Sequence, residues 1–285
     1  MCEFCVKHGE GEKWYLRTKN YSEDLLSDVK RRRFIEHFSD PKTVAREIKK
    51  GTRGMERLQK MPRFISYMLK RMIVRNMKKV HFGQVVPIEE IEQIFGFTNS
   101  IVRVACICRQ ATTGKEKRYC YGISLAPDHG AFGQIFGKFY ATPEGGPDTT
   151  GFETLTREQA IAAFRDHEHE GLCHTVWTLH TPFIGGICNC DRSDCLAMRA
   201  SITHGVSSMF RAEYVALVDS EACAGCRECM RFCQFGALTY SAASKKAVIV
   251  QRWCYGCGVC RAACRKNAIT LMDRRNSPAA ANLWQ

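Results

Sequence analysis

The residues best suited to chemistry are seventeen cysteines, a high number for a chain of 285 residues. Eight of them form two runs of the pattern C-x2-C-x2-C-x3-C, which are Cys223, Cys226, Cys229 and Cys233, and then Cys254, Cys257, Cys260 and Cys264. Thiolates at this spacing are typical ligands of [4Fe–4S] clusters. Zinc sites usually pair two C-x2-C knuckles instead. The spacing therefore predicts iron–sulfur chemistry rather than zinc binding or a disulfide framework.

The two runs belong to an internal duplication. Each cysteine of the second run follows its counterpart by 31 residues, and the same offset relates Gly225 to Gly256 and the pair Ala237-Leu238 to Ala268-Ile269. Short apolar segments at 214–218 and 247–250 precede the two runs and are expected to be strands. Repetition at one fixed offset indicates two copies of one structural unit.

Residues 211–272 resemble the bacterial-type 2[4Fe–4S] ferredoxins, in which the fourth cysteine of each run binds the other cluster. The resemblance implies a duplicated βαβ fold with two clusters. Carried onto this sequence, cluster A is held by Cys223, Cys226, Cys229 and Cys264, and cluster B by Cys254, Cys257, Cys260 and Cys233. The family usually has proline after each fourth cysteine, where this chain has Gln234 and Arg265. This departure spares the ligands but affects the expected loop rigidity and cluster potential.

Six further cysteines lie in two similar arrangements upstream. Cys106, Cys108 and Cys120 follow a predicted strand at 101–105, and Cys188, Cys190 and Cys195 follow another that runs through Trp177. Residues two apart on an extended strand share one face, so Cys106 and Cys108 are expected to point at one centre. A helix, a strand, C-x-C and a third cysteine thus occur twice, at 87–120 and 156–195, separated by a turn-rich loop at 141–151.

The segments V-A-C-I-C-R and G-G-I-C-N-C-D make residues 80–200 similar to 4Fe–4S-binding proteins that carry C-x-C-R and I-C-N-C segments ahead of a ferredoxin domain. That resemblance implies no defined reaction. We expect at least one additional [4Fe–4S] cluster here, and one or two in all over residues 1–200; zinc and unmetallated buried thiols are the alternatives. Cys2 and Cys5, with His8, could supply further ligands at the N-terminus, and Cys173 is an additional thiol nearby.

The overall pattern predicts an α+β chain of four parts. These are a basic helical region at 1–86, a cysteine-rich and metal-binding mixed α/β domain at 87–210, the ferredoxin-like domain at 211–272, and a loosely ordered tail at 273–285. Helices are expected to begin near Ser22, at Pro41 with Asp40 as cap, near Pro62, at Pro87, and after the capping box of Thr156 and Gln159. Gly51 and Gly54 are expected to break the second of these helices.

The positive charge is concentrated near the N-terminus. Residues 1–86 hold 21 Lys or Arg against 10 Asp or Glu, within a chain of formal net charge +13. Residues 55–80 predict a basic amphipathic helix with a methionine-rich stripe. The simplest interpretation is that this stripe packs on the core. The alternatives are docking to an acidic redox partner, a membrane surface or nucleic acid, the last disfavoured because aromatic residues do not alternate with the charges.

These features favour an iron–sulfur electron-transfer protein, as a subunit or dedicated partner of a redox enzyme complex. No Walker A loop, dinucleotide fingerprint or HExxH motif indicates a catalyst acting alone. So many thiolates suit a reducing, anaerobic cytoplasm, and neither a secretory signal nor a membrane-spanning segment is visible. The alternatives are an enzyme whose N-terminal cluster has an open coordination site, and a redox-sensing regulator that binds nucleic acid.

Overall fold

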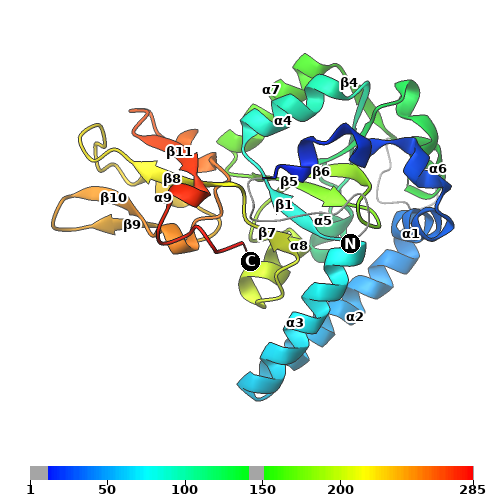
Figure 1. The fold of residues 1–285 in the computed structure, drawn as a ribbon, viewed down its shortest axis with the longest axis horizontal. Coiled ribbons are helices and arrows are strands. Elements are labelled where there is room, and N and C mark those ends of the chain that lie inside the picture. Colours follow the sequence, from blue (N-terminus) through cyan, green and yellow to red (C-terminus); the bar gives the residue numbers. More distant parts are fainter. Residues whose placement is uncertain (1–11, 141–150, 285) are drawn as a thin grey trace.

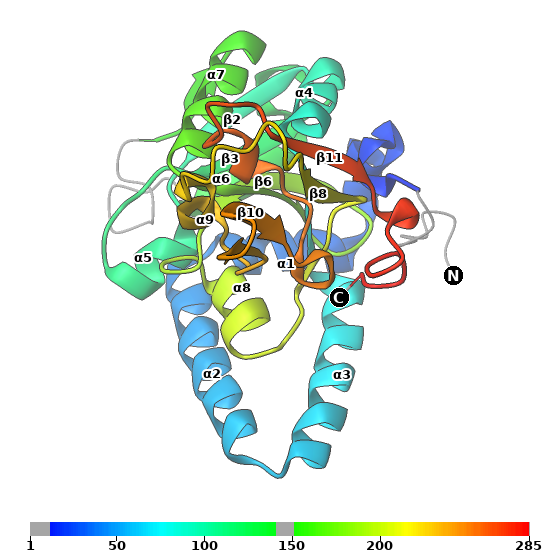
Figure 2. The same ribbon diagram turned by 90° about the vertical axis from the view of Figure 1, so that its left-hand side faces the viewer.

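The computed structural model describes residues 12–140 and 151–284, so Cys2, Cys5 and most of the predicted loop at 141–151 lie outside the described residues. The chain is α+β. A sheet flanked by helices forms the larger part, the C-terminal domain lies against one side of it, and a pair of long helices projects as an arm (Figures 1 and 2). Among the described residues no helix is both long and apolar enough to span a membrane.

A seven-stranded sheet organises the larger part, with the order β4-β2-β3-β6-β5-β1-β7. All neighbouring strands are antiparallel except β1 and β7. The strands are β1 (Gly83–Val85), β2 (Ser100–Val104), β3 (Cys120–Ser124), β4 (Glu153–Leu155), β5 (Cys173–Thr178), β6 (Ile184–Cys190) and β7 (Met209–Phe210). Strand β1 precedes the boundary predicted at residue 87, yet it lies in the same sheet as the strands that follow it.

Helices of more than one turn surround this sheet. They are α1 (Val29–Ser39), α2 (Pro41–Lys60), α3 (Arg63–Val80), α4 (Ile88–Phe97), α5 (Ile107–Thr113), α6 (Gly130–Tyr140) and α7 (Arg157–His169). Short turns η1 (Trp14–Leu16), η2 (Thr18–Tyr21) and η3 (Glu23–Ser27) precede α1, and α8 (Leu196–Met198) with η5 (Arg199–Thr203) follows β6. The predicted capping box of Thr156 and Gln159 starts α7.

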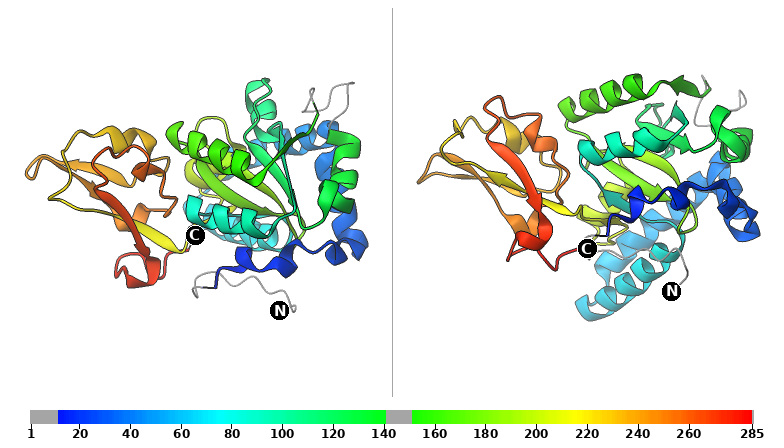
Figure 3. Two further views of the ribbon diagram at one scale, coloured as in Figure 1. Left: turned by 90° about the horizontal axis from the view of Figure 1, so that it is seen from above. Right: turned by 45° about the horizontal axis from the view of Figure 1, so that its top comes forward.

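The two faces of the sheet have different roles. Ile101, Tyr121 and Val176 point into the main apolar core, which α4, α7 and the η1–η2 turns complete. Because neighbours along a strand point to opposite faces, Cys120, Cys188 and Cys190 lie on the other face. That face is covered by α1, α5, α6 and α8 (Figure 3). The sheet thus separates a conventional core from a cysteine-bearing layer.

The C-terminal domain contains two antiparallel strand pairs. Strand β8 (Tyr214–Val218) pairs with β11 (Ile269–Asp273), and β9 (Leu238–Ser241) pairs with β10 (Lys246–Ile249). Helix α9 (Glu228–Phe232) and the matching turn η7 (Val259–Arg261) lie between the strands of each half. Each half therefore contributes one strand to each pair, and the duplicated βαβ description of the halves stays a prediction.

Three expectations from the sequence are wrong. Helix α2 continues through Gly51 and Gly54, beside which a Cβ atom would meet no atom within 4 Å; two glycines weaken an exposed helix by about 2 kcal/mol but do not end it. The methionine-rich stripe of α3 is largely exposed instead of packed on the core.

The third wrong expectation is the loosely ordered tail at 273–285, because residues 273–284 form regular contacts with the rest of the protein. A 3₁₀ turn, η8 (Arg274–Asn276), follows β11, and the fully buried Arg274 donates hydrogen bonds to the carbonyls of Ala212, Tyr214 and Cys254. Trp284 lies over the Arg274 guanidinium at 5.6 Å and accepts a backbone hydrogen bond from Arg211. The tail therefore ties β8 and the cluster B loop together.

Candidate functional site

The two cysteine loops of the C-terminal domain depend on glycine for their shape. Gly225 and Gly256 have φ values of +67° and +73°, a region that favours glycine. A Cβ atom at Gly225 would stand 2.2 Å from the Lys245 carbonyl oxygen, and one at Gly256 would stand 2.0 Å from that of Tyr214. The duplicated glycines therefore let the first loop pass against the turn between β9 and β10, and the second loop against β8.

The cysteines assigned to cluster B by the resemblance line one small cavity. Cys233, Cys254, Cys257 and Cys260 surround it together with Phe235 and other apolar side chains. Burial comes first among the causes that raise the pKa of Cys260, and the other three thiols of this set raise it further. Such a cavity walled by four thiols fits a [4Fe–4S] cube, which takes one thiolate at each iron.

The cysteines assigned to cluster A also neighbour one another. Burial raises the pKa of Cys229 to about 11, and Cys226, Cys264 and Cys223 add to the effect. Cys226 is exposed, whereas Cys254 and Cys260 are buried. The two halves thus have different surroundings, because most of the cluster A loop is exposed and the cluster B loop packs on the sheet domain.

Backbone N–H groups point at the sulfur atoms in both halves. Ala237 donates to Cys233 Sγ at 3.2 Å, and Ala268 donates to Cys264 Sγ at 3.3 Å. These alanines are members of the duplicated pairs 31 residues apart. A donor aimed at sulfur favours the thiolate over the thiol and shifts the potential of a bound cluster. The backbone donor is therefore a feature that both halves share.

The six upstream cysteines converge on one site, which we call the six-cysteine site. All of them line a cavity of about 100 Å³ on the cysteine-bearing face of the sheet, and they are Cys106, Cys108, Cys120, Cys188, Cys190 and Cys195. Cys120 and Cys188 are direct partners across β3 and β6, and the sulfurs of Cys190 and Cys195 are 3.2 Å apart. The two C-x-C segments therefore build one centre.

The route by which Cys106 and Cys108 reach this centre differs from the expected one. Strand β2 ends at Val104, Cys106 caps α5, and Cys108 lies in its first turn. Their convergence comes from a strand-to-helix corner and not from a shared strand face. Cys188 and Cys190, in contrast, share one face of β6.

A buried arginine supplies positive charge to the six-cysteine site. Arg109 is 2% exposed, lines the cavity, and pairs with Asp191. Its guanidinium also donates to the Asn189 carbonyl at 3.0 Å and lies 3.5 Å from Cys106 Sγ. A fixed cation beside clustered sulfurs offsets their negative charge. The C-x-C-R segment thus contributes both its thiols and its cation to one centre.

The thiols of the six-cysteine site have strongly perturbed ionisation. Burial raises the pKa of Cys106, while hydrogen bonding to Cys108 and then to Cys190 lowers the pKa of Cys195. Metal binding requires thiolates and releases their protons. Neighbouring thiols therefore favour the thiolate form of Cys195, the form that binds metal.

Six neighbouring thiols offer enough ligands for either a [4Fe–4S] cluster or a zinc ion. Within residues 12–140 and 151–284, no three His, Cys, Asp or Glu side chains converge as ligands of one metal ion. Zinc requires all its thiolates at about 2.3 Å from one point, whereas a cube holds each thiolate on a separate iron. The same absence holds for the ferredoxin-type cysteines, so it does not decide between zinc and a cluster at the six-cysteine site.

Cys173, which the sequence indicated only as an additional thiol, joins the two parts of the molecule. It is fully buried on β5, is the strand partner of Cys190, and donates its S–H to the His174 carbonyl at 3.7 Å. Its side chain also neighbours Cys257, and this proximity lowers the pKa of Cys257. Cys173, Cys190 and Cys195 share an apolar cluster with Tyr255 and Cys257. Sequence adjacency gave no signal for this contact across domains.

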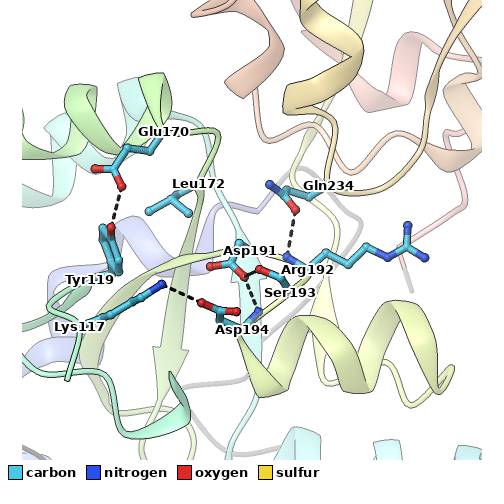
Figure 4. A pocket seen from close by; sticks show the side chains of 9 residues that line it. All are labelled: Lys117, Tyr119, Glu170, Leu172, Asp191, Arg192, Ser193, Asp194 and Gln234. Carbon is cyan, nitrogen blue, oxygen red and sulfur yellow. Dashed lines mark hydrogen bonds and ion pairs between the residues drawn. The ribbon is translucent and has the colours of Figure 1, made fainter. Parts of the chain in front are cut away.

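Gln234, at one of the positions where the ferredoxin family has proline, also joins the two parts. Its amide donates to the Gly171 carbonyl at 2.7 Å and accepts from the Arg192 N–H at 2.9 Å. Figure 4 shows this side chain at the edge of a pocket of about 490 Å³, opposite Lys117, Glu170 and Asp194. Arg265, its counterpart after the other fourth cysteine, is exposed. Of the two residues that replace proline, Gln234 therefore bonds to the sheet domain and Arg265 is exposed.

Comparison with known proteins identifies the class of the C-terminal domain. Residues 216–265 match the family model of the 4Fe-4S dicluster domain. The C-terminal domain is therefore of ferredoxin type, with an iron–sulfur electron-transfer role. No curated protein matches the chain.

Proposed function

We propose that the chain is an electron relay with three iron–sulfur centres, and that it works as a subunit or dedicated partner of a redox enzyme complex in the cytoplasm. Electrons pass between cluster A at the surface, cluster B at the domain junction, and a third cluster in the six-cysteine site. Such cubes exchange one electron at a time, and the protein sets spacing, burial and hydrogen bonding around them.

The contact between Cys173 and Cys257 is the observation that carries this proposal. It places a proposed cluster B ligand against a thiol whose strand partner, Cys190, belongs to the six-cysteine site. The salt bridge from Arg261 to Glu89, with N–O distances of 2.5 and 2.9 Å, and the Gln234 bonds hold the same junction. If the two centres worked independently, no contact between the cysteines around them would be required.

Metal analysis of anaerobically purified protein tests the proposal. Three cubes predict about twelve iron and twelve sulfide per chain, whereas two predict about eight of each. Cys195→Ala should remove about four irons, and Cys257→Ala should remove cluster B. A wild-type content of eight irons with one zinc would assign the six-cysteine site to zinc and refute a third cluster.

A second candidate function is catalysis at the six-cysteine site, and the other residues that line its cavity favour it. Six thiols exceed the four corners of a cube, and the same cavity is also lined by Trp177, Phe132 and His81. Burial lowers the pKa of His81 to about 4, so its ring is neutral near pH 7. A small apolar substrate would fit there. Turnover by the isolated chain with a reductant would support this candidate, and a centre ligated by four cysteines would count against it.

A further inference from the structure

The arm formed by α2 and α3, residues 41–80, is the largest feature that electron relay leaves unexplained. It extends well beyond the sheet and ends in the turn between the two helices (Figures 1 and 2). The proximal part of α3 is anchored, because Val74, Ile73 and Met77 pack on the main core. The distal part carries large apolar side chains that are exposed, including Phe64 at 75% and Met68 at 53%.

The apolar residues follow one face of α3. Ile65, Met68 and Met72 recur at spacings of three and four, which places them in a single row of the helix, and Met61 precedes them in the turn before it. All four are exposed, as is Phe64 beside them. The helical part of the row extends about 10 Å at 1.5 Å per residue. Six of the ten large apolar side chains that are exposed in the described residues lie within 61–72.

The same row becomes cationic toward the body of the protein. Arg75 and Lys79 continue it at the same spacing, and both are exposed. The whole arm holds thirteen Lys or Arg against two Glu, so its charge of +11 accounts for most of the formal net charge of +13. Exposed basic residues occur on both helices, for example Lys49 and Arg53 on α2 and Arg63 and Arg71 on α3.

We propose that the arm binds an anionic lipid surface, with its distal apolar row in the boundary between headgroups and acyl chains. An interfacial helix combines an apolar face with Lys and Arg that meet anionic headgroups. Along the row on α3 the polarity changes in that order, from apolar at Ile65 to basic at Lys79, while Arg57, Lys60 and Arg63 add exposed charge at the tip. Basic side chains near the tip can extend along the helix and keep their charges at headgroup level.

A lipid surface explains the charge distribution better than an acidic protein groove does. A groove contacts one face of a helix through anchors at i, i+3, i+4 and i+7, so it would leave the basic residues of α2 without a counterpart. A charged membrane attracts basic residues on every side of the arm within a Debye length. The proposal goes beyond electron relay and does not depend on which metal the six-cysteine site holds.

Vesicle sedimentation of the full-length, metal-loaded protein tests this inference. The probes are vesicles of phosphatidylcholine alone and vesicles with about one third phosphatidylglycerol, a surface that attracts basic segments. We expect sedimentation with the second kind only, decreasing as salt rises. The double variant F64S/M68S should bind at least about tenfold more weakly, because it removes two apolar side chains from the buried face. R71E/R75E should also weaken binding about tenfold or more.

Matched controls separate these effects from misfolding. Val248→Ser changes an exposed apolar residue on β10, and Lys115→Glu reverses an exposed charge in the loop after α5; neither should alter binding. Helix content by circular dichroism and iron per chain should match wild type in every variant. Failure to bind anionic vesicles at low salt, or equal binding by F64S/M68S, would overturn the proposal. A dimer in sedimentation velocity that F64S/M68S dissociates would assign the row to a second copy of the chain instead.

Discussion

At the scale of single residues, Cys173 differs from the other buried thiols because it contacts a cysteine of the other domain. In the structure the Cys173 S–H donates to the His174 carbonyl at 3.7 Å. If it turns toward Cys257 when a cluster is bound, its donation to the ligand sulfur stabilises the reduced, more negative state. One such hydrogen bond contributes about 1 kcal/mol, which corresponds to roughly 40 mV for one electron. We expect Cys173→Ala to lower the potential of cluster B by that order.

Potentiometric titration followed by EPR would measure this shift. Cys173→Ser keeps a donor at the same place and should recover most of the wild-type potential. If both variants leave the potential of cluster B unchanged, the contact has no electronic role and serves packing alone.

Gln234 gives a second prediction at this scale, with a control supplied by the duplication. Gln234→Pro restores the usual family residue but removes both hydrogen bonds to the sheet domain. We expect the junction to weaken by about 1–3 kcal/mol, at roughly 1 kcal/mol per bond, and amide exchange in segment 190–195 to accelerate. Arg265→Pro changes the equivalent, exposed position and should leave that exchange unaltered. Equal exchange in both variants would contradict the role assigned to Gln234.

At the scale of elements, the cluster loops depend on glycine where a strand backbone is close. Gly256→Ala would drive its Cβ into the Tyr214 carbonyl oxygen, and we expect a loss of more than about 3 kcal/mol of stability together with lost iron. Gly236→Ala is the matched control, because Gly236 also has a positive φ, +68°, but open space around it. It should cost only about 1 kcal/mol. Urea unfolding and iron content would separate the two outcomes.

Elements specified by local chemistry could be predicted from the sequence. Pro41 begins α2, Thr156 and Gln159 cap α7, and the strand that ends at Val104 appears where an apolar run indicates it. Local sequence preference gave wrong predictions where the free-energy differences are small or where the deciding contacts are distant in the sequence. Gly51 and Gly54 cost an exposed helix too little to end it.

The candidate sites divide in the same way. Eight cysteines with a fixed 31-residue repeat identify the ferredoxin-type domain directly. The convergence of the six upstream cysteines was expected in part, although Cys106 and Cys108 reach the site from a helix start. The contact of Cys173 with Cys257 joins positions 84 residues apart on different domains, so no periodicity or local spacing could indicate it. The ligand sets of all three centres, like the four-part domain division, stay predictions.

At the scale of the whole molecule, the junction between the domains contains a buried carboxyl group. Glu213 lies between β7 and β8, is 3% exposed, and its Oε1 has no hydrogen-bond partner among the described residues. Burial raises the pKa of Glu213 to about 7. The unfolded chain releases this proton near pH 4.5, so stability decreases as pH rises from there to about 7.

Glu213→Gln should therefore stabilise the protein at pH 8 by on the order of 1–3 kcal/mol, with the gain vanishing below about pH 4.5. The urea midpoint of wild type and variant at several pH values would show this difference. A variant that is equally or less stable than wild type at pH 8 would show that Glu213 is charged and compensated in the folded protein.

The duplicated ferredoxin-type domain is symmetric in sequence but not in its surroundings. The loop of Cys223 to Cys229 meets solvent, whereas that of Cys254 to Cys260 is enclosed by the sheet domain, Arg274 and the tail. The loop at 219–229 is therefore the part of the domain that can be replaced without disturbing the junction. Under the proposed relay, grafting the corresponding loop of another ferredoxin there would change which redox partner the chain recognises. The same graft into the second half would disrupt the contacts of Cys257 and Arg274 at the junction.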